Sequence, residues 1–207
     1  MLLLYSEMEL AEKYSIIPFD SEHIHIIRTG LSDRNGDEKI RVEKIVTLND
    51  IKQVQAGYGS SRIGIIVLYG YSRNYLFNVS NKGYFSDFGG GIGKREKLYD
   101  GLVREVKQEV PLWADYFLHR AEDDFVNCHV VETLYVDKPE KNMIEALVFI
   151  MINDYEFETL PEFEPSTEVI SLFIIPETDI QAWLQSTDNK LLNTGLMQYK
   201  KHLMGTL

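Results

Sequence analysis

The segment from residue 88 to residue 112, FGGGIGKREKLYDGLVREVKQEVPL, constrains the fold of this 207-residue chain more than any other. A glycine-rich loop leads directly into a helical pattern in which Leu98, Leu102, Val106 and Val110 recur every four residues. This spacing places the four side chains in one apolar stripe, so that this face of the helix must be buried against another element. The chain must therefore fold around a loop and helix that are packed on one side and polar on the other.

Strand-like and helical patterns alternate along the rest of the chain, and 44% hydrophobic residues suffice for a sizeable core. This alternation is typical of a sheet covered by helices, an α/β or α+β layer structure. No repeat or linker marks a boundary, so we expect one domain over residues 1–207, with residues 1–59 as an N-terminal extension or added elements. We expect strands at residues 63–69, 75–79, 125–136, 146–152 and 169–175, helices from about residue 96 and at 113–120, 178–185 and 191–203, and a turn at 30–39.

The net charge of -11 is concentrated in residues 142–189, which contain ten acidic residues and no Lys or Arg. Because nucleic-acid backbones are gripped by Lys and Arg, this balance argues against broad, sequence-independent binding to RNA or DNA. The longest apolar run, Ala146–Ile152, is too short to span a membrane. The single cysteine, Cys128, cannot form an internal disulfide and lies in an alternating apolar context. We therefore expect a protein of a reducing, cytoplasmic compartment with no membrane partner and with Cys128 in the core.

A phosphate-binding P-loop is one interpretation of the glycine-rich segment, and the spacing rejects it. That motif requires a glycine, four residues, and then Gly-Lys followed by Ser or Thr. Counting back from Gly93 and Lys94 places Phe88 where the glycine belongs, and Arg95 follows in place of the hydroxyl residue. The loop must be explained by a different motif.

Acidic residues flank the apolar stripe of the helix. Glu105 and Glu109 are four residues apart, so the bases of their side chains lie about 5 to 6 Å apart and can reach one cation. Carboxylate oxygens are the ligands that Mg²⁺ selects. Arg104 lies on another face and can pair with Glu96, which would tie the loop to the helix. The alternative is an amphipathic helix whose charged residues are merely solvated.

The complete spacing favours the first interpretation. Gly90, Glu96, Arg104-Glu105-Val106, Gln108-Glu109 and Pro111-Leu112 resemble the Nudix box, G-x5-E-x7-R-E-U-x-E-E-x-G-U, in which U is aliphatic, with seven of nine specified positions matched. The resemblance implies a Nudix-like α/β/α sandwich, a mixed sheet between helices, over about residues 60–185. It also implies that Glu105, Glu109 and the Gly89 carbonyl would bind Mg²⁺ or Mn²⁺. Gly90, Glu96 and Arg104 would support the site.

The segment departs from the family pattern at three positions. Gln108 stands at a metal-ligand position where the family has glutamate, which removes one negative charge and predicts weaker or fewer metal sites. Pro111 replaces a glycine after the helix, a mild change because proline commonly follows a helix end. Phe88 replaces the proline that often precedes the glycine pair, so the loop on the substrate side is expected to differ.

Many Nudix enzymes take a general base, or a further metal ligand, from a glutamate on the loop before a late strand. Here Glu162, Glu164 and Glu168 precede the strand expected at residues 169–175. Glu168 is the first choice for a catalytic role beside Glu105, and Glu164 the second. The alternative is an exposed acidic loop without a catalytic role.

Aromatic side chains beside the glycine-rich loop are candidates for stacking on a nucleotide base. Tyr84, Phe85 and Phe88 occupy these positions, although such residues serve equally well as core. His23 and His25 fall on one face of a strand-like run, but two histidines without further ligands are a weak indication of metal.

The resemblance implies hydrolysis of a phosphoanhydride bond in a nucleoside diphosphate linked to another group, with metal-assisted attack of water. Two alternatives stay open. One is removal of the cap from RNA. The other is a protein that binds nucleotides or a partner without turnover, and the reason to consider it is Gln108. The sequence names neither the substrate nor the oligomeric state, and a homodimer is one option.

Overall fold

The computed structural model describes residues 7–17, 26–56, 59, 61–123 and 126–204, and His23 and His25 lie outside these residues. Within these ranges the strands form one nine-stranded mixed sheet in the order β1-β2-β7-β8-β3-β4-β5, with β6 beside β3 and β9 beside β4. Strands β3 and β8 are parallel, and the other pairs are antiparallel. The strands are β1 (Ile26–Ser32), β2 (Glu38–Thr47), β3 (Arg62–Tyr69), β4 (Asn74–Ser80), β5 (Phe85–Ser86), β6 (Phe88–Gly91), β7 (Asn127–Tyr135), β8 (Met143–Ile152) and β9 (Val169–Ile175).

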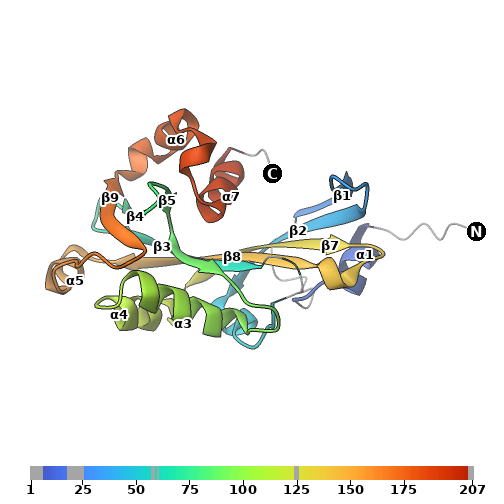
Figure 1. The fold of residues 1–207 in the computed structure, drawn as a ribbon, viewed down its shortest axis with the longest axis horizontal. Coiled ribbons are helices and arrows are strands. Elements are labelled where there is room, and N and C mark those ends of the chain that lie inside the picture. The colour runs from blue at the N-terminus through green and yellow to red at the C-terminus, as the bar shows by residue number, and fades with distance from the viewer. Residues whose placement is uncertain (1–6, 18–25, 57–58, 60, 124–125, 205–207) are drawn as a thin grey trace, which may run out of the picture.

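Helices cover both faces of this sheet (Figure 1). Helices α3 and α4 lie on one face, and α6 and α7 lie on the other. The predicted mixed sheet between helices is confirmed. The helices are α1 (Glu7–Tyr14), α2 (Leu48–Ile51), α3 (Leu98–Glu109), α4 (Ala114–Ala121), α5 (Asp154–Thr159), α6 (Glu177–Ser186) and α7 (Thr194–Leu203), with short 3-10 turns at Pro139–Lys141 and Asn189–Leu191.

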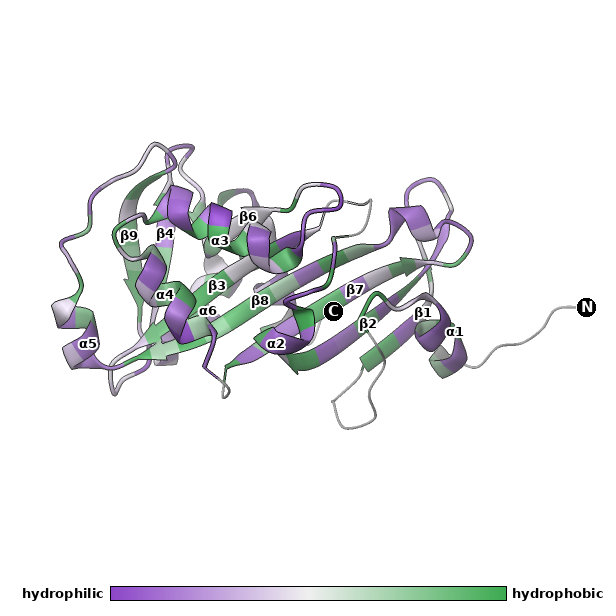
Figure 2. Ribbon diagram, turned by 90° about the horizontal axis from the view of Figure 1, so that it is seen from below, coloured by the Kyte–Doolittle hydropathy of each residue, from purple (hydrophilic) through white to green (hydrophobic). Residues whose placement is uncertain are grey.

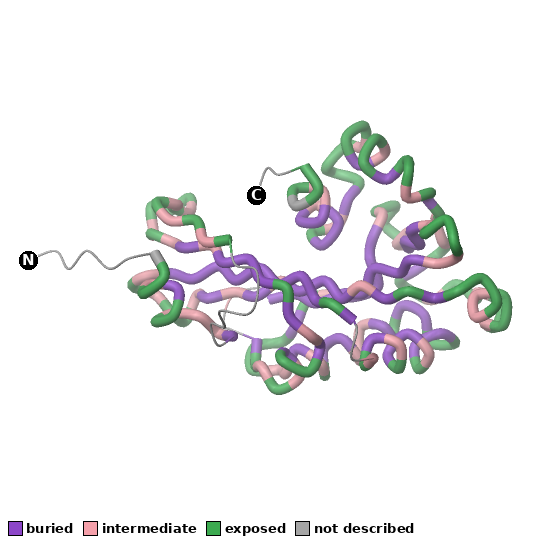
Figure 3. Tube along the Cα trace, turned by 180° about the vertical axis from the view of Figure 1, so that it is seen from behind, coloured by how far each residue is buried: buried purple, intermediate pink, exposed green. Residues whose placement is uncertain are grey.

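Side chains of the central strand β3 alternate between two hydrophobic cores, one on each face of the sheet. Ile63, Ile65 and Val67 face α3 and α4, whereas Ile66 and Leu68 face α6 and α7. Successive side chains of a strand point to opposite faces, so a strand covered on both sides is apolar at nearly every position. The purple tube along the central strands in Figure 3 shows this two-sided burial.

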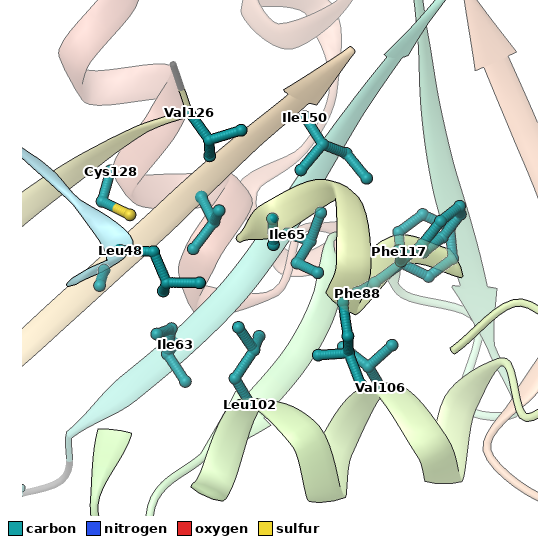
Figure 4. Close-up of a cluster of buried hydrophobic side chains, with 14 of the residues drawn as sticks. Leu48, Ile63, Ile65, Phe88, Leu102, Val106, Phe117, Val126, Cys128 and Ile150 are labelled. Carbon is teal, nitrogen blue, oxygen red and sulfur yellow. The ribbon is translucent and has the colours of Figure 1, made fainter. Parts of the chain in front are cut away.

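The apolar stripe of α3 packs as predicted. Leu98, Leu102 and Val106 are fully buried against the sheet. In Figure 4 the labelled Leu102 and Val106 rise from the helix toward Ile63 and Phe88. In Figure 2 the ribbon of α3 carries both hydrophilic and hydrophobic residues along its length. Burial of this stripe sets the rotation of α3 about its own axis. The rotation decides which residues of the helix reach the loop that precedes the helix.

The predicted turn at residues 30–39 is too long. Strand β1 continues to Ser32, β2 begins at Glu38, and β2 then pairs with β7 from Lys39 to Thr47. We predicted no strand at residues 40–47. Strands β1 and β2 come from the expected N-terminal extension, and they belong to the same sheet as the strands around α3.

Candidate active site

The loop before α3 begins as a strand. Strand β6 pairs with β3, with Gly89 opposite Gly64 and Gly90 opposite Ile63. A side chain at Gly89 would place its Cβ 2.3 Å from the Gly64 Cα and from the Ile63 carbonyl oxygen, so only glycine fits this close approach. The Gly89 backbone is therefore held against the centre of the sheet, and α3 packs beside it.

Glu109, the last residue of α3, turns its carboxyl toward this loop. Its Oε2 accepts hydrogen bonds from the Gly89 amide at 2.9 Å and from Asn78 Nδ2 at 3.3 Å, and the residue is 7% exposed. Burial, with the nearby carboxylates of Asp87 and Glu105 adding to it, raises the pKa of Glu109 to about 9. The Gly89 amide and the Arg62 guanidinium oppose this shift. Without an added cation, Glu109 is therefore protonated at neutral pH.

Glu105 reaches the same loop from the preceding turn of α3. A Cβ added to Gly90 would lie 2.2 Å from Glu105 Oε2, so the carboxylate rests directly over the glycine backbone. Its side chain is 13% exposed and pairs with Arg104 Nη1. Glu105 and Glu109 thus converge on two consecutive glycines, and their role as metal ligands stays a prediction.

The predicted pair between Arg104 and Glu96 is present. Arg104 donates from Nε to Glu96 Oε1 at 3.1 Å and from Nη2 to Glu96 Oε2 at 3.0 Å. Nη2 also donates to the Gly91 carbonyl at 3.0 Å, and Glu96 accepts from the Gly93 amide at 2.7 Å. The hydrogen bond with Arg104 is the main cause that lowers the pKa of Glu96. The pair therefore ties both ends of the loop to α3.

Sequence reasoning missed a buried ion pair on the opposite side of the loop. Arg62 contacts both carboxylate oxygens of Asp87, and Nη2 also donates to the Gly89 carbonyl at 3.3 Å. Burial alone would lower the pKa of Arg62, but Asp87, with smaller contributions from Glu109 and Glu145, outweighs burial and raises the pKa, so the guanidinium stays charged. Asn78, which contacts Glu109, was also missed. The available signal was a lone Arg at the start of an apolar strand and a lone Asp beside the glycines.

Gln108 lies outside this cluster. It is exposed, and its contact is a long one, 3.5 Å from Arg104 Nη1 to Gln108 Oε1. The side chain lies one helical position from Glu109 and faces solvent. A role for Gln108 as a metal ligand stays a prediction.

The three glutamates before β9 are exposed. Glu164 borders a shallow depression with Val110 and Trp113 at the end of α3. Glu168 lies next to β9, where its carbonyl accepts from the Asn81 amide at 2.8 Å. Among the described residues, no hydrogen bond or ion pair joins Glu162, Glu164 or Glu168 to Glu105 or Glu109. Their catalytic role stays a prediction.

The prediction that Phe88 stacks on a substrate is wrong. Its ring is 0% exposed and packs edge to face on Phe117 in the core beneath α3 (Figure 4). Phe85 is partly buried against Phe173 and Trp183 on the α6 side, which leaves little of its ring for a ligand. Tyr84 is 41% exposed and stays a candidate.

The donor set fits a hard divalent cation. Glu105 and Glu109 supply two carboxylates, and Asn78 Oδ1, beside Glu109, is buried without a hydrogen-bond partner in the described part of the chain. Within that same part, no three His, Cys, Asp or Glu side chains are grouped as a complete metal site. Mg²⁺ commonly uses one or two carboxylates and takes its remaining ligands from water and substrate phosphates. The arrangement suits a cation that protein and substrate share.

Two adjoining cavities lie away from this cluster. One of about 680 Å³ is lined by residues that include Leu68, Arg120 and Tyr199, and one of about 340 Å³ by residues that include Gly70 and Arg120. Both are at the far end of β3 from Gly64. Neither is lined by a residue of the predicted site.

Two further predictions concern the core and membranes. Cys128 is 0% exposed, as predicted, and burial raises the pKa of its thiol. Trp183 packs partly buried against Phe77 and Phe85. No helix among the described residues has the length and apolar character to cross a membrane.

Several solved structures resemble this chain. An Ap4A hydrolase from C. elegans is 12% identical over 70% of this chain and 98% of that chain, with a TM-score of 0.40. A pyrophosphohydrolase from Bacillus subtilis is 13% identical over 85% and 96%, with a TM-score of 0.39. A Nudix-family hydrolase from Clostridium perfringens is 12% identical over 70% and 96%, with a TM-score of 0.37. No protein-family model and no curated protein matches the chain. The assignment of a reaction therefore rests on the residues of the chain itself.

Proposed function

We propose that this protein is a metal-dependent hydrolase of the Nudix type that cleaves a phosphoanhydride bond in a nucleoside diphosphate linked to another group. The observation that carries the proposal is the convergence of Glu105 and Glu109 on Gly89 and Gly90. These residues belong to the segment that resembles the Nudix box. The loop and the helix are held in register by Arg104 and Glu96, as that resemblance implies.

Glu105 and Glu109 would hold Mg²⁺ or Mn²⁺ against the diphosphate. When bound, the cation would polarise phosphoryl oxygens and lower the pKa of a ligated water. Glu109 would hold the cation in its ionised form, because a protonated carboxyl is a poor ligand. In the reaction, the oxygen of water forms a bond to phosphorus while the bridging phosphoanhydride bond breaks. Glu168, or Glu164 in its place, would accept the proton of that water.

The first test is product release from dinucleotides, nucleotide sugars, nucleoside triphosphates and capped RNA, with Mg²⁺ or Mn²⁺. Glu105→Gln keeps the size of the side chain but removes its charge, and we expect kcat to fall by about 10² to 10⁴ on any substrate that the wild type cleaves. Glu158→Gln, the same exchange on the exposed surface of α5, is the matched control and should retain the wild-type rate.

The outcomes separate the alternatives. Equal rates for Glu105→Gln and wild type would contradict the assignment of the site. Tight nucleotide binding without turnover on the whole panel would instead indicate a binding protein, in line with the glutamine at position 108. Release of a capped nucleoside diphosphate from RNA alone would identify the decapping activity. Glu168→Gln and Glu164→Gln, measured in parallel, test which carboxylate accepts the proton.

A further inference from the structure

The Arg62–Asp87 pair is built into the wall of the candidate site. The Arg62 side chain is 11% exposed and the Asp87 side chain is 0% exposed, and two hydrogen bonds of 2.7 and 2.5 Å join them. A Cβ at Gly64 would lie 1.9 Å from Asp87 Oδ2, and a Cβ at Gly195 would lie 2.2 Å from Arg62 Nη1. The two glycines leave room for this pair and for little else.

The guanidinium of Arg62 also holds the loop. Its Nη2 donates to the Gly89 carbonyl at 3.3 Å, while the amide of the same residue donates to Glu109 at 2.9 Å. Both backbone groups of Gly89 are therefore fixed by charged or ionisable side chains, one from β3 and one from α3. Glu105 rests over the next residue, Gly90. Any shift of the Gly89 peptide would move the backbone on which the two carboxylates converge.

The first turn of α7 completes the arrangement. Asn193 accepts a hydrogen bond from the Leu196 amide at 2.9 Å, as a helix N-cap does, and donates to Asp87 Oδ1 at 2.8 Å. Asp87 is thus held from the sheet by Arg62 and from the helix by Asn193. A buried ion pair is weak evidence for stability, because desolvation opposes its Coulombic attraction. Its contacts with the loop point to a role in geometry.

We propose that Arg62 is a positioning residue which, with Asp87 and Asn193, fixes the Gly89 carbonyl and thereby the cation-binding geometry of Glu105 and Glu109. The part that concerns the cation rests on the proposed function. An explanation based on charge alone predicts a different result. A variant that keeps the net charge of the Arg62–Asp87 pair leaves the electrostatic potential at the cation site nearly unchanged, so cation affinity would stay at the wild-type value. Loss of positioning weakens binding instead.

The charge-preserving variant Arg62→Lys tests the proposal. An ammonium lacks the planar fork that contacts Asp87 and Gly89 together. We expect Mn²⁺ affinity, measured by the EPR signal of free Mn²⁺, to fall by about 10- to 100-fold, the range for groups that orient metal ligands. We also expect faster hydrogen–deuterium exchange at the amides of residues 88–91 in protein without metal. The double variant Arg62→Gln/Asp87→Asn, which leaves no unpaired charge, should behave likewise and serves if the single variant does not fold.

The matched control is another buried ion pair in the same sheet. Lys44→Gln/Glu132→Gln removes a pair that is 0% exposed and lies away from the loop, and it should change neither Mn²⁺ affinity nor exchange at residues 88–91. Exchange at residues 88–91 that matches the control, or Mn²⁺ affinity of the Arg62 variants equal to or higher than that of the wild type, would overturn the proposal. A wild type that binds no Mn²⁺ would contradict the proposed function, and the exchange result would still decide the role of Arg62.

Discussion

Glu109 differs from the other acidic residues of α3 because it is the one that is buried. Its hydrogen bonds with Gly89 and Asn78 orient it, but the carboxylates of Asp87 and Glu105 lie nearby, and Arg62 is already paired with Asp87. A buried carboxyl in this setting favours its protonated form. A divalent cation would reverse that preference by supplying positive charge where Glu109 and Glu105 converge.

The raised pKa of Glu109 predicts how stability depends on pH. The native state keeps the proton up to a pH of about 9, whereas the unfolded state loses it near 4.5, the ordinary pKa of a glutamate side chain. Between these values the native state binds more protons, so the free energy of unfolding falls as pH rises, by at most about 1.4 kcal/mol per pH unit from this group. Urea unfolding of the metal-free protein at several pH values should show this slope.

Glu109→Gln is the control for that slope. The amide keeps an oxygen acceptor for the Gly89 amide but has no proton to lose, so the fall in stability with pH should become shallower. Added Mg²⁺ should stabilise the wild type most at alkaline pH and should have little effect on the variant. Parallel pH profiles for the two proteins would contradict the buried, protonated carboxyl.

Strands and helices with an unbroken apolar pattern could be predicted from the sequence. The strand at Val169–Ile175 has the predicted bounds, and α3 begins at Leu98 rather than near Glu96 because Glu96 belongs to the turn that Arg104 holds. Strand β2 was missed because charged residues, Glu43 and Lys44, occupy buried positions in it. Burial that depends on a partner distant in sequence leaves no local pattern.

In the candidate site, too, some residues could be predicted from the sequence and others could not. Glu105 and Glu109 share one helix, so their spacing alone predicts that they lie together. Arg62, Asp87 and Asn193 come from three separate parts of the chain, and no spacing rule connects them. Phe88 was misjudged because its closeness to the glycine-rich loop does not tell which face of β6 its ring occupies. The strand pairing decides that face, and it directs the ring into the core.

The missed strand β2 holds the N-terminal segment through Lys44. Its ammonium contacts Glu132 at 3.0 Å, Ser15 Oγ at 2.6 Å and the Ile17 carbonyl at 2.7 Å, with no exposed side-chain surface. Lys44→Met would leave Glu132 buried without its counter-charge, so we expect the free energy of unfolding to fall by about 3 to 5 kcal/mol. Chemical denaturation measures this loss.

Lys52→Met gives the comparison. Lys52 pairs with Glu122 at 2.7 Å, but the two side chains are 31% and 41% exposed. An exposed pair contributes about 0 to 1 kcal/mol, so this variant should remain close to wild type. A similar loss in the free energy of unfolding for Lys44→Met and Lys52→Met would show that burial does not make the Lys44–Glu132 pair more important than the Lys52–Glu122 pair.

The nine strands form one sheet within the described residues. Strands β1 and β2 of the predicted N-terminal extension therefore belong to the same sheet as the strands around α3. Strand β2 pairs with β7 over nine registered positions, from Lys39 opposite Tyr135 to Thr47 opposite Asn127. Ile40, Val42 and Leu134 form a small core with α1 on the same side of the sheet as α3. The extension thus covers both the edge and part of the face of β7.

This continuity predicts that residues 60–207 do not fold alone. Without residues 1–59, β7 presents an unpaired edge of the kind that promotes aggregation, and Glu132 loses Lys44 and the amides of Ile16 and Ile17. We expect the truncated chain to be insoluble or to unfold without a cooperative transition by circular dichroism. Co-expression of residues 1–59 as a separate chain should restore cooperative unfolding, because the missing strand and counter-charge are then supplied. Cooperative unfolding of residues 60–207 at the midpoint of the full chain would instead make the extension an independent addition, and the site around α3 would then be complete without it.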